Sequence, residues 1–304
     1  MDTSMSWNAP PRVTIGMPVY NGGDGLGHVI ESILGQTYKN LKLVISDNAS
    51  SDQTESICRE FEAHDDRVIY IRQAKNIGAE ANFDFVLSKA NTEYFMWAAA
   101  DDLRSREFIE KNIAFLDRNL DFLASTCPVR FAGSEFDPIR MGDQTRDEAD
   151  PFIRMLNFFQ FWHANGRFYS LFRTNALHAL KSPRRSYLGS DWTIVVELLQ
   201  KGKFKRLDSG FLELGRQGLS NSPDIFARYR NRTICWLLPM IDFSLTIVPL
   251  FARASFKYKV RILLILLKAN LITFKWQIKF ELKRTYSRFT SGGKSVTSVC
   301  GLKT

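Results

Sequence analysis

The feature that most constrains the fold of this chain is an alternation of short apolar segments with segments of helical periodicity over residues 13–120. The apolar segments are rich in β-branched and aromatic residues, as is typical of buried strands. They are Val13–Met17, Leu41–Ser46, Arg67–Ile71 and Tyr94–Trp97. The periodicity predicts helices over 26–34, 51–61, 79–90 and 109–120. Since strands that alternate with helices form parallel sheets with right-handed crossovers, we predict an α/β fold.

Polar residues follow each predicted strand. They are Tyr20 and Asn21, Asp47, Asn76 and Gly78, and Asp101 and Asp102. Pro18 is expected to end the first strand because it has no N–H for the ladder. In a parallel α/β sheet, ligands bind outside the carboxyl ends of the strands, so these residues are predicted to form one site.

The neighbouring carboxylates Asp101 and Asp102 indicate a cation or a donor-rich ligand. A nucleoside diphosphate would be repelled by them unless a divalent cation lay between, and Mg²⁺ and Mn²⁺ prefer such oxygen ligands. Asp47 could accept hydrogen bonds from a nucleobase or from ribose hydroxyls. The alternative for all three residues is ordinary turn and helix-cap chemistry.

Two segments of the chain resemble the family 2 glycosyltransferases of the GT-A fold. They are "GMPVYNGGDGLGHVIESILGQTYKNLKLVISDNASSDQT" and "KNIGAEANFDFVLSKANTEYFMWAAADDL". The resemblance is close from Val13 to Leu103 and looser to about Ser220. It implies a GT-A-type nucleotide-diphospho-sugar transferase fold: a mostly parallel central sheet flanked by helices, here with a helical C-terminal extension. Residues 1–225 are predicted to be the catalytic domain and 226–304 a basic, apolar helical region.

The resemblance also implies roles for individual residues. Pro18, Val19, Tyr20 and Asn21 would border the nucleotide pocket, with Asn76 also on the donor side. Asp47 would contact the base. Asp101 would be the last Asp of an Asp-x-Asp metal motif, with Asp102 behind it, so the implied cofactor is Mn²⁺ or Mg²⁺. The first Asp of that motif is replaced by Ala99.

Two later residues are implied in the same way. Asp191 occupies the place of the acceptor-side carboxylate and would act as general base in a single displacement that inverts the anomeric configuration. From the sequence alone, the favoured role of Asp191 is to stabilise the N-terminus of the helix that follows, and only the resemblance makes it the general base. Arg216, in "GRQGLSN", is the candidate phosphate ligand, or else a solvated loop charge; Gln217 stands where a His is often found.

Positive charge is concentrated at the C-terminal end. Residues 226–304 contain 15 basic and two acidic residues, a net charge of +13, whereas the other 225 residues carry 26 basic and 30 acidic residues, a net of −4. The basic residues alternate with aliphatic ones and no nucleic-acid-binding module is recognised, so we predict no nucleic-acid partner. The helix predicted after Lys259 is basic with a broad apolar face, which favours attachment to an anionic membrane surface.

Other interpretations of this region stay open: packing on the catalytic domain, formation of a homodimer, or a true membrane span. The segment 233–251 is only marginally long enough to span, and it contains Asp242. The N-terminus lacks a secretory signal pattern, and the four cysteines have no metal or disulfide spacing. We therefore expect a cytoplasmic protein, peripheral at the inner face of the membrane.

The sequence thus predicts an inverting transfer from a nucleotide-diphosphate-sugar donor to a glycan or lipid-linked glycan acceptor, in cell-surface polysaccharide or lipopolysaccharide synthesis. Ala99 also motivates an alternative, a nucleotide-sugar-binding domain without turnover. A nicotinamide-linked oxidoreductase is disfavoured, because "PVYNGGDGLG" lacks the Gly-x-Gly-x-x-Gly turn directly after the first strand.

Overall fold

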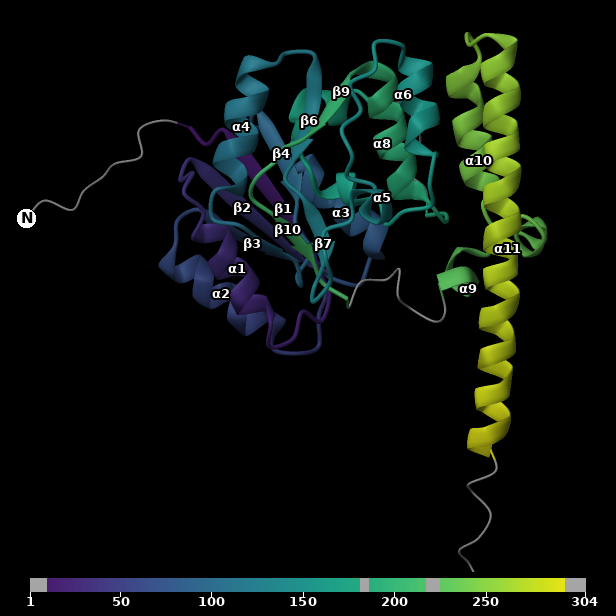
Figure 1. Cartoon of the computed structure of the whole chain (residues 1–304). Helices are drawn as coiled ribbons and strands as arrows, with labels where there is room; N and C mark the ends of the chain where they lie inside the picture. Colours follow the sequence, from purple (N-terminus) through teal and green to yellow (C-terminus); the bar gives the residue numbers. More distant parts are fainter. Residues whose placement is uncertain (1–9, 181–185, 217–224, 293–304) are drawn as a thin grey trace, which may run out of the picture.

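The computed structural model describes residues 10–180, 186–216 and 225–292, with side chains to residue 283. A seven-stranded sheet runs in the order β3-β2-β1-β4-β8-β6-β9 (Figure 1). Its strands are β1 (Val13–Val19), β2 (Leu41–Asp47), β3 (Val68–Arg72), β4 (Tyr94–Trp97), β6 (Phe122–Thr126), β8 (Leu171–Arg173) and β9 (Lys203–Arg206). β8 is antiparallel to both β4 and β6, whereas the other neighbours are parallel. The mostly parallel α/β fold is therefore confirmed.

The first strand does not end at Pro18, as the sequence predicted, but continues to Val19. The Ala98 N–H donates to the Gly16 carbonyl, so Gly16 and, two residues on, Pro18 face the β4 side of the strand. Pairing with β4 stops at Gly16. The missing N–H of Pro18 therefore breaks no ladder bond, and β1 stays paired with β2 as far as Asp47.

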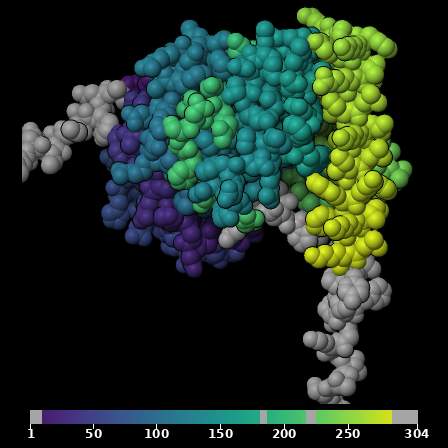
Figure 2. Space-filling view, viewed as in Figure 1, coloured from purple at the N-terminus to yellow at the C-terminus, as the bar shows by residue number. Residues whose placement is uncertain are grey.

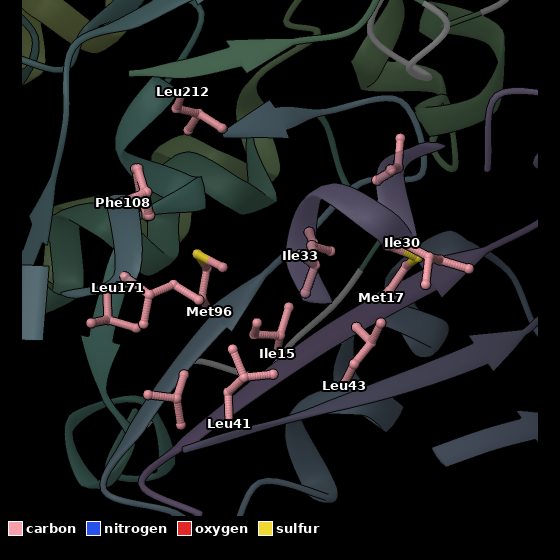
Figure 3. Packing of buried hydrophobic residues seen from close by; sticks show 14 of the residues in the cluster. Ile15, Met17, Ile30, Ile33, Leu41, Leu43, Met96, Phe108, Leu171 and Leu212 are labelled. Atoms are coloured by element: carbon pink, nitrogen blue, oxygen red, sulfur yellow. The ribbon is translucent and has the colours of Figure 1, made fainter. Parts of the chain in front are cut away.

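Helices cover both faces of the sheet. They are α1 (Leu26–Leu34), α2 (Thr54–His64), α3 (Ala79–Ser88), α4 (Phe108–Arg118), α5 (Pro138–Met141), α6 (Pro151–Phe158), α7 (Thr174–His178), α8 (Ser190–Lys201), α9 (Ile225–Tyr229), α10 (Ile241–Ile247) and α11 (Phe256–Gly292). Because side chains alternate along a strand, each face has its own hydrophobic core. Ile15 and Met17 of β1 pack with Ile30 and Ile33 of α1 in one core (Figure 3). Trp97 of β4 belongs to the other core.

A second, three-stranded sheet has the order β5-β10-β7, formed by β5 (Leu103–Arg104), β10 (Leu212–Leu214) and β7 (Val129–Phe131). β10 runs antiparallel to β5, the strand that directly follows Asp101 and Asp102. Gly215, the residue after β10, therefore lies against these two carboxylates, and its N–H donates to Asp102 Oδ1 at 3.1 Å.

The C-terminal region packs along one flank of the sheet domain (Figure 2). Phe243 of α10 and Ile262 and Leu266 of α11 are buried in the same core as Trp97 and the residues of α8. The domain boundary predicted at residue 225 would separate side chains that share one core. This division into two domains stays a prediction. Among the helices described, none combines the length and apolarity needed to cross a bilayer.

Candidate functional site

A cavity of about 1070 Å³ opens at the carboxyl ends of the parallel strands. It brings together most residues that the sequence singled out. Those lining it are Pro18, Val19, Tyr20, Asn21, Asn76, Asp101, Asp102 and Asp191. Asp47 and Arg216 are described by the structure but are not part of this lining.

The end of the cavity formed by the loops after β1, β2 and β3 is built by polar contacts between loops. The Asn21 N–H donates to Ser50 Oγ, and the Ser51 N–H donates to Asn21 Oδ1, both at 2.9 Å. Asn48 Nδ2 donates to Asn76 Oδ1 at 3.1 Å. These bonds leave Tyr20 half exposed at the rim, available to contact a ligand.

Asp47 is completely buried beneath this end, and each of its oxygens already has a partner in the protein. Oδ1 accepts from the Ser50 N–H, and Oδ2 accepts from the Tyr70 hydroxyl and from Arg72 Nη1, at 2.7 Å each. Direct contact with a nucleobase stays a prediction. In the present arrangement Asp47 holds Arg72 and the loop after β2 in place.

Asp101 and Asp102 lie where β4 ends. Asp102 is almost fully buried, and burial raises its pKa to about 6, although Arg104 and the Gly215 N–H oppose this shift. Its Oδ2 is 4.0 Å from Arg104 Nη2 and has no hydrogen-bond partner among the described residues. A Cβ added to Gly215 would lie 2.0 Å from Asp101 Oδ2, so only glycine fits there without displacing that carboxylate.

The carboxylate pair therefore fits a divalent cation in part. A buried oxygen without a hydrogen-bond partner and a neighbouring carboxylate are suitable ligands for Mn²⁺ or Mg²⁺. Within the described residues, however, no three His, Cys, Asp or Glu side chains are grouped to hold a metal. Further ligands would have to come from phosphates or water.

Asp191 lies in the first turn of α8, as predicted, and its side chain lines the same cavity. Burial raises its pKa, whereas a hydrogen bond from Asn165 and the backbone N–H of Trp192 act in the opposite direction. Tyr169 stands near both sets of carboxylates. Its pKa is raised first by burial and then by the negative charges of Asp102, Asp191 and Asp101.

Asn165 is a site residue that the sequence reasoning missed. It is buried, has a left-handed backbone with φ of 56°, and its Nδ2 donates to Asp191 Oδ2 at 2.8 Å. The only local signal was the "NG" pair, which is typical of left-handed turns. Its N–H donates to Nδ1 of His163, whose Nε2 donates to the Phe158 carbonyl. Burial lowers the pKa of His163 to about 3, so this imidazole stays neutral and keeps its acceptor.

The side chain of Arg216 does not line the cavity but hydrogen-bonds to the loop after β7. Its Nε donates to the Ala132 carbonyl and its Nη2 to Ser134 Oγ. The predicted phosphate contact stays a prediction, and residues 217–221 of the "GRQGLSN" segment lie outside the described residues. Two other cations line the cavity and were not foreseen, Arg140 and Arg228.

Comparison with solved structures defines the class of fold. TarS of Staphylococcus aureus (residues 1–349, in complex with UDP-GlcNAc) aligns over 83% of this chain and 70% of its own, with a TM-score of 0.59 and 16% identity. The mannosyltransferase PcManGT of Pyrobaculum calidifontis, in complex with GDP-Man and Mn²⁺, aligns over 95% and 81%, with a TM-score of 0.55 and 16% identity. The fold is thus that of the GT-A glycosyltransferases.

The sequence relatives make the assignment more specific. The family profile "Glycosyl transferase family 2" matches residues 14–180. EpsE of Bacillus subtilis, whose name describes it as a glycosyltransferase, is 37% identical to this chain over 113 residues. These residues make up 37% of this chain and 41% of EpsE. The chain belongs to glycosyl transferase family 2, and the match spans about two fifths of the length of EpsE.

Proposed function

We propose that this protein transfers a sugar from a nucleotide-diphosphate-sugar donor to an acceptor hydroxyl, with inversion at the anomeric carbon. The observation that carries the proposal is the cavity shared by Asp101, Asp102 and Asp191 around Tyr169. The loops after β1 to β3 supply a polar end for a nucleotide, and Asp101, Asp102 and Asp191 line the same cavity. TarS and PcManGT, which share the fold, have been solved with nucleotide sugars.

Asp191 is the proposed general base. A base near the acceptor hydroxyl takes its proton while the oxygen attacks the anomeric carbon, and the bond to the diphosphate breaks on the opposite face. One displacement of this kind inverts the configuration. Burial brings the pKa of Asp191 upward, toward the range useful for proton transfer, while Asn165 binds one carboxylate oxygen and keeps it oriented.

Asp101 and Asp102 are the proposed ligands of Mn²⁺ or Mg²⁺, together with the donor diphosphate. When bound, such a cation neutralises the charge on the departing diphosphate. Ala99 lines the cavity at the position where a further carboxylate would stand, so fewer protein ligands are present. The role of Gly215 is to leave room for Asp101 and to bind Asp102 through its N–H.

The isosteric variant Asp191→Asn tests this function. We expect release of nucleoside diphosphate from UDP-, GDP- and dTDP-sugars to fall at least ~100-fold, because general-base catalysis contributes at least that much. Thermal stabilisation by the nucleoside diphosphates with Mn²⁺ should be unchanged. Wild-type turnover in the variant would refute the base assignment. Nucleotide binding without turnover in the wild-type protein would favour the alternative, an inactive nucleotide-sugar-binding domain.

The proposed setting is a membrane surface, where a lipid-linked glycan of a cell-surface polysaccharide or lipopolysaccharide pathway would be the acceptor. On α11, the exposed apolar residues Val260, Leu264, Leu267 and Leu271 recur at spacings of four, three and four, and Ile278 lies seven residues further along the same face. Arg261, Lys268 and Lys275 form a row beside them, since a spacing of seven returns to the same helix face.

Charge complementarity selects an anionic lipid surface as the partner of this face. Glu281 is the one acid in the side-chain-described part of α11, and it is paired with Arg230 at 2.8 Å. A second copy of the helix would bring a further row of cations, whereas anionic headgroups would neutralise this row. Peripheral binding at the inner, cytoplasmic face is therefore the localisation that we propose, and a homodimer is the competing outcome.

A further inference from the structure

The helix α11 contributes directly to the wall of the cavity that contains Asp191. Thr273, Trp276 and Phe280 line the cavity. Their spacing of three and four residues puts them on one face of the helix, distinct from the exposed apolar face described above. The C-terminal region is therefore part of the site as well as a neighbour of the sheet domain.

Two indoles meet at this wall from segments far apart in the sequence. Trp162, in the loop after α6, and Trp276 have ring centroids 5.2 Å apart and nearly perpendicular planes. Both line the cavity, and they remain 38% and 43% exposed. Large aromatic side chains are normally buried, so an exposed pair of indoles inside a cavity is a candidate ligand-binding surface.

Contacts connect this pair to the proposed base. Trp162 packs on Trp192 with centroids 5.1 Å apart, and Trp192 directly follows Asp191. Asn165, which binds Asp191, lines the cavity too, and its buried Oδ1 has no hydrogen-bond partner among the described residues. The cavity thus offers a ligand both aromatic surface and an oxygen acceptor that has no partner among the described residues.

We propose that Trp162, Trp276 and Asn165 form the acceptor subsite and that its occupant is a pyranose ring. A pyranose has an apolar C–H face, suited to an indole, and hydroxyl groups at its edge, suited to Asn165 Oδ1 and Asp191. A purely aliphatic ligand would leave the Asn165 oxygen unsatisfied. This inference rests on the proposed function, since it concerns the acceptor of the same reaction.

The test measures, by saturation-transfer NMR, the binding of methyl glycosides to the full chain. The glycosides are those of glucose, galactose, mannose and N-acetylglucosamine. We expect at least one glycoside to bind wild type through its ring C–H protons. Trp276→Leu should weaken that binding about tenfold, which corresponds to the contribution of one aromatic contact, and Trp276→Phe should largely restore it. Phe256→Leu is the matched control, because Phe256 is an exposed aromatic of α11 outside the cavity.

Equal binding in wild type and Trp276→Leu, or binding of none of the four glycosides by wild type, would overturn the inference. Thermal midpoints of the variants are measured alongside, and Trp276→Phe separates a binding defect from a folding defect. Glycoside binding needs neither donor nor turnover. Absence of glycoside binding with intact release of nucleoside diphosphate from a nucleotide sugar is thus distinguishable from failure of the proposed function, in which that release itself is absent.

Discussion

Asn165 donates a hydrogen bond of 2.8 Å from its side-chain amide to Oδ2 of Asp191, across 26 residues of sequence. The left-handed backbone of Asn165 and its N–H bond to His163 Nδ1 hold that amide in position. Since the bond favours the charged carboxylate, Asn165 counteracts the effect of burial on the pKa of Asp191. The orientation of the proposed base is therefore decided by the loop before β8.

Replacing Asn165 should move the pH dependence of turnover. Asn165→Gly keeps the left-handed backbone but removes the hydrogen bond, so the pKa of Asp191 rises and the acid limb of kcat shifts to higher pH. Asn165→Asp adds a like charge and should shift that limb further in the same direction. Profiles of kcat against pH test the series, and superimposable profiles would contradict this role.

Protonation of His163 should destabilise the protein in mild acid. Burial lowers the folded-state pKa of this group to about 3, against an ordinary value of 6.5, so the unfolded chain binds the proton more readily. Stability is complete above pH 6.5 and falls as the pH decreases below it, by about 2 kcal/mol at pH 5. In His163→Gln, the difference between unfolding free energies at pH 7 and pH 5 should shrink by about that amount. Urea denaturation measures it, and an unchanged difference would argue against a buried neutral imidazole.

Adding a methyl group at Gly215 should disturb the carboxylate pair. In Gly215→Ala the new Cβ would lie 2.0 Å from Asp101 Oδ2, so Asp101 must move. We expect Mn²⁺-dependent binding of nucleoside diphosphate to weaken about tenfold, in the range known for altered support of metal ligands. Gly25→Ala is the matched control, because a Cβ there meets nothing within 4 Å. Titration calorimetry compares the two, and equal affinities would remove Asp101 from the metal site.

The core shared by the C-terminal region and the sheet domain predicts a single unfolding transition. Phe243 is buried in that core, so Phe243→Ala should cost about 3–5 kcal/mol. Leu245, on the same helix, is exposed, and Leu245→Ala should change stability by less than about 0.5 kcal/mol. Denaturation followed by both far-UV circular dichroism and tryptophan fluorescence should give coincident curves. Two separate transitions would support independent folding of residues 226–304.

Charge reversal on α11 should abolish membrane binding. In Lys268→Glu/Lys275→Glu/Lys279→Glu, each change removes an attraction of about 1 kcal/mol to anionic lipid and adds a repulsion. Co-sedimentation with vesicles of phosphatidylglycerol and phosphatidylcholine should fall at least ~100-fold relative to wild type. A second triple variant, Lys39→Glu/Lys75→Glu/Lys89→Glu, controls for net charge. Concentration-dependent dimerisation without vesicle binding would instead assign this face to a second copy of the chain.

Much of the sheet and of its polar edge could be predicted because the signals are local. The apolar runs before Asn21, Asp47 and Asp101 specify strands, and chain direction in a parallel sheet brings their ends to one edge. Asp191 was found through a family resemblance carried by the helix that follows it. Among the described residues, Cys58, Cys127 and Cys235 are buried thiols.

Tertiary structure decided which partners these residues have. Arg72 and Tyr70 occupy the carboxylate of Asp47, and Asn165 orients Asp191, although neither arrangement has a periodic signature. Trp276 reaches the cavity only because α11 folds back along the sheet domain. The sequence by itself determined the strands, the polar residues that follow each strand and the basic, apolar C-terminal region, since these features depend on neighbours along the chain. Burial, pKa and the composition of the cavity depend on segments distant in sequence, and only packing in three dimensions brings those together.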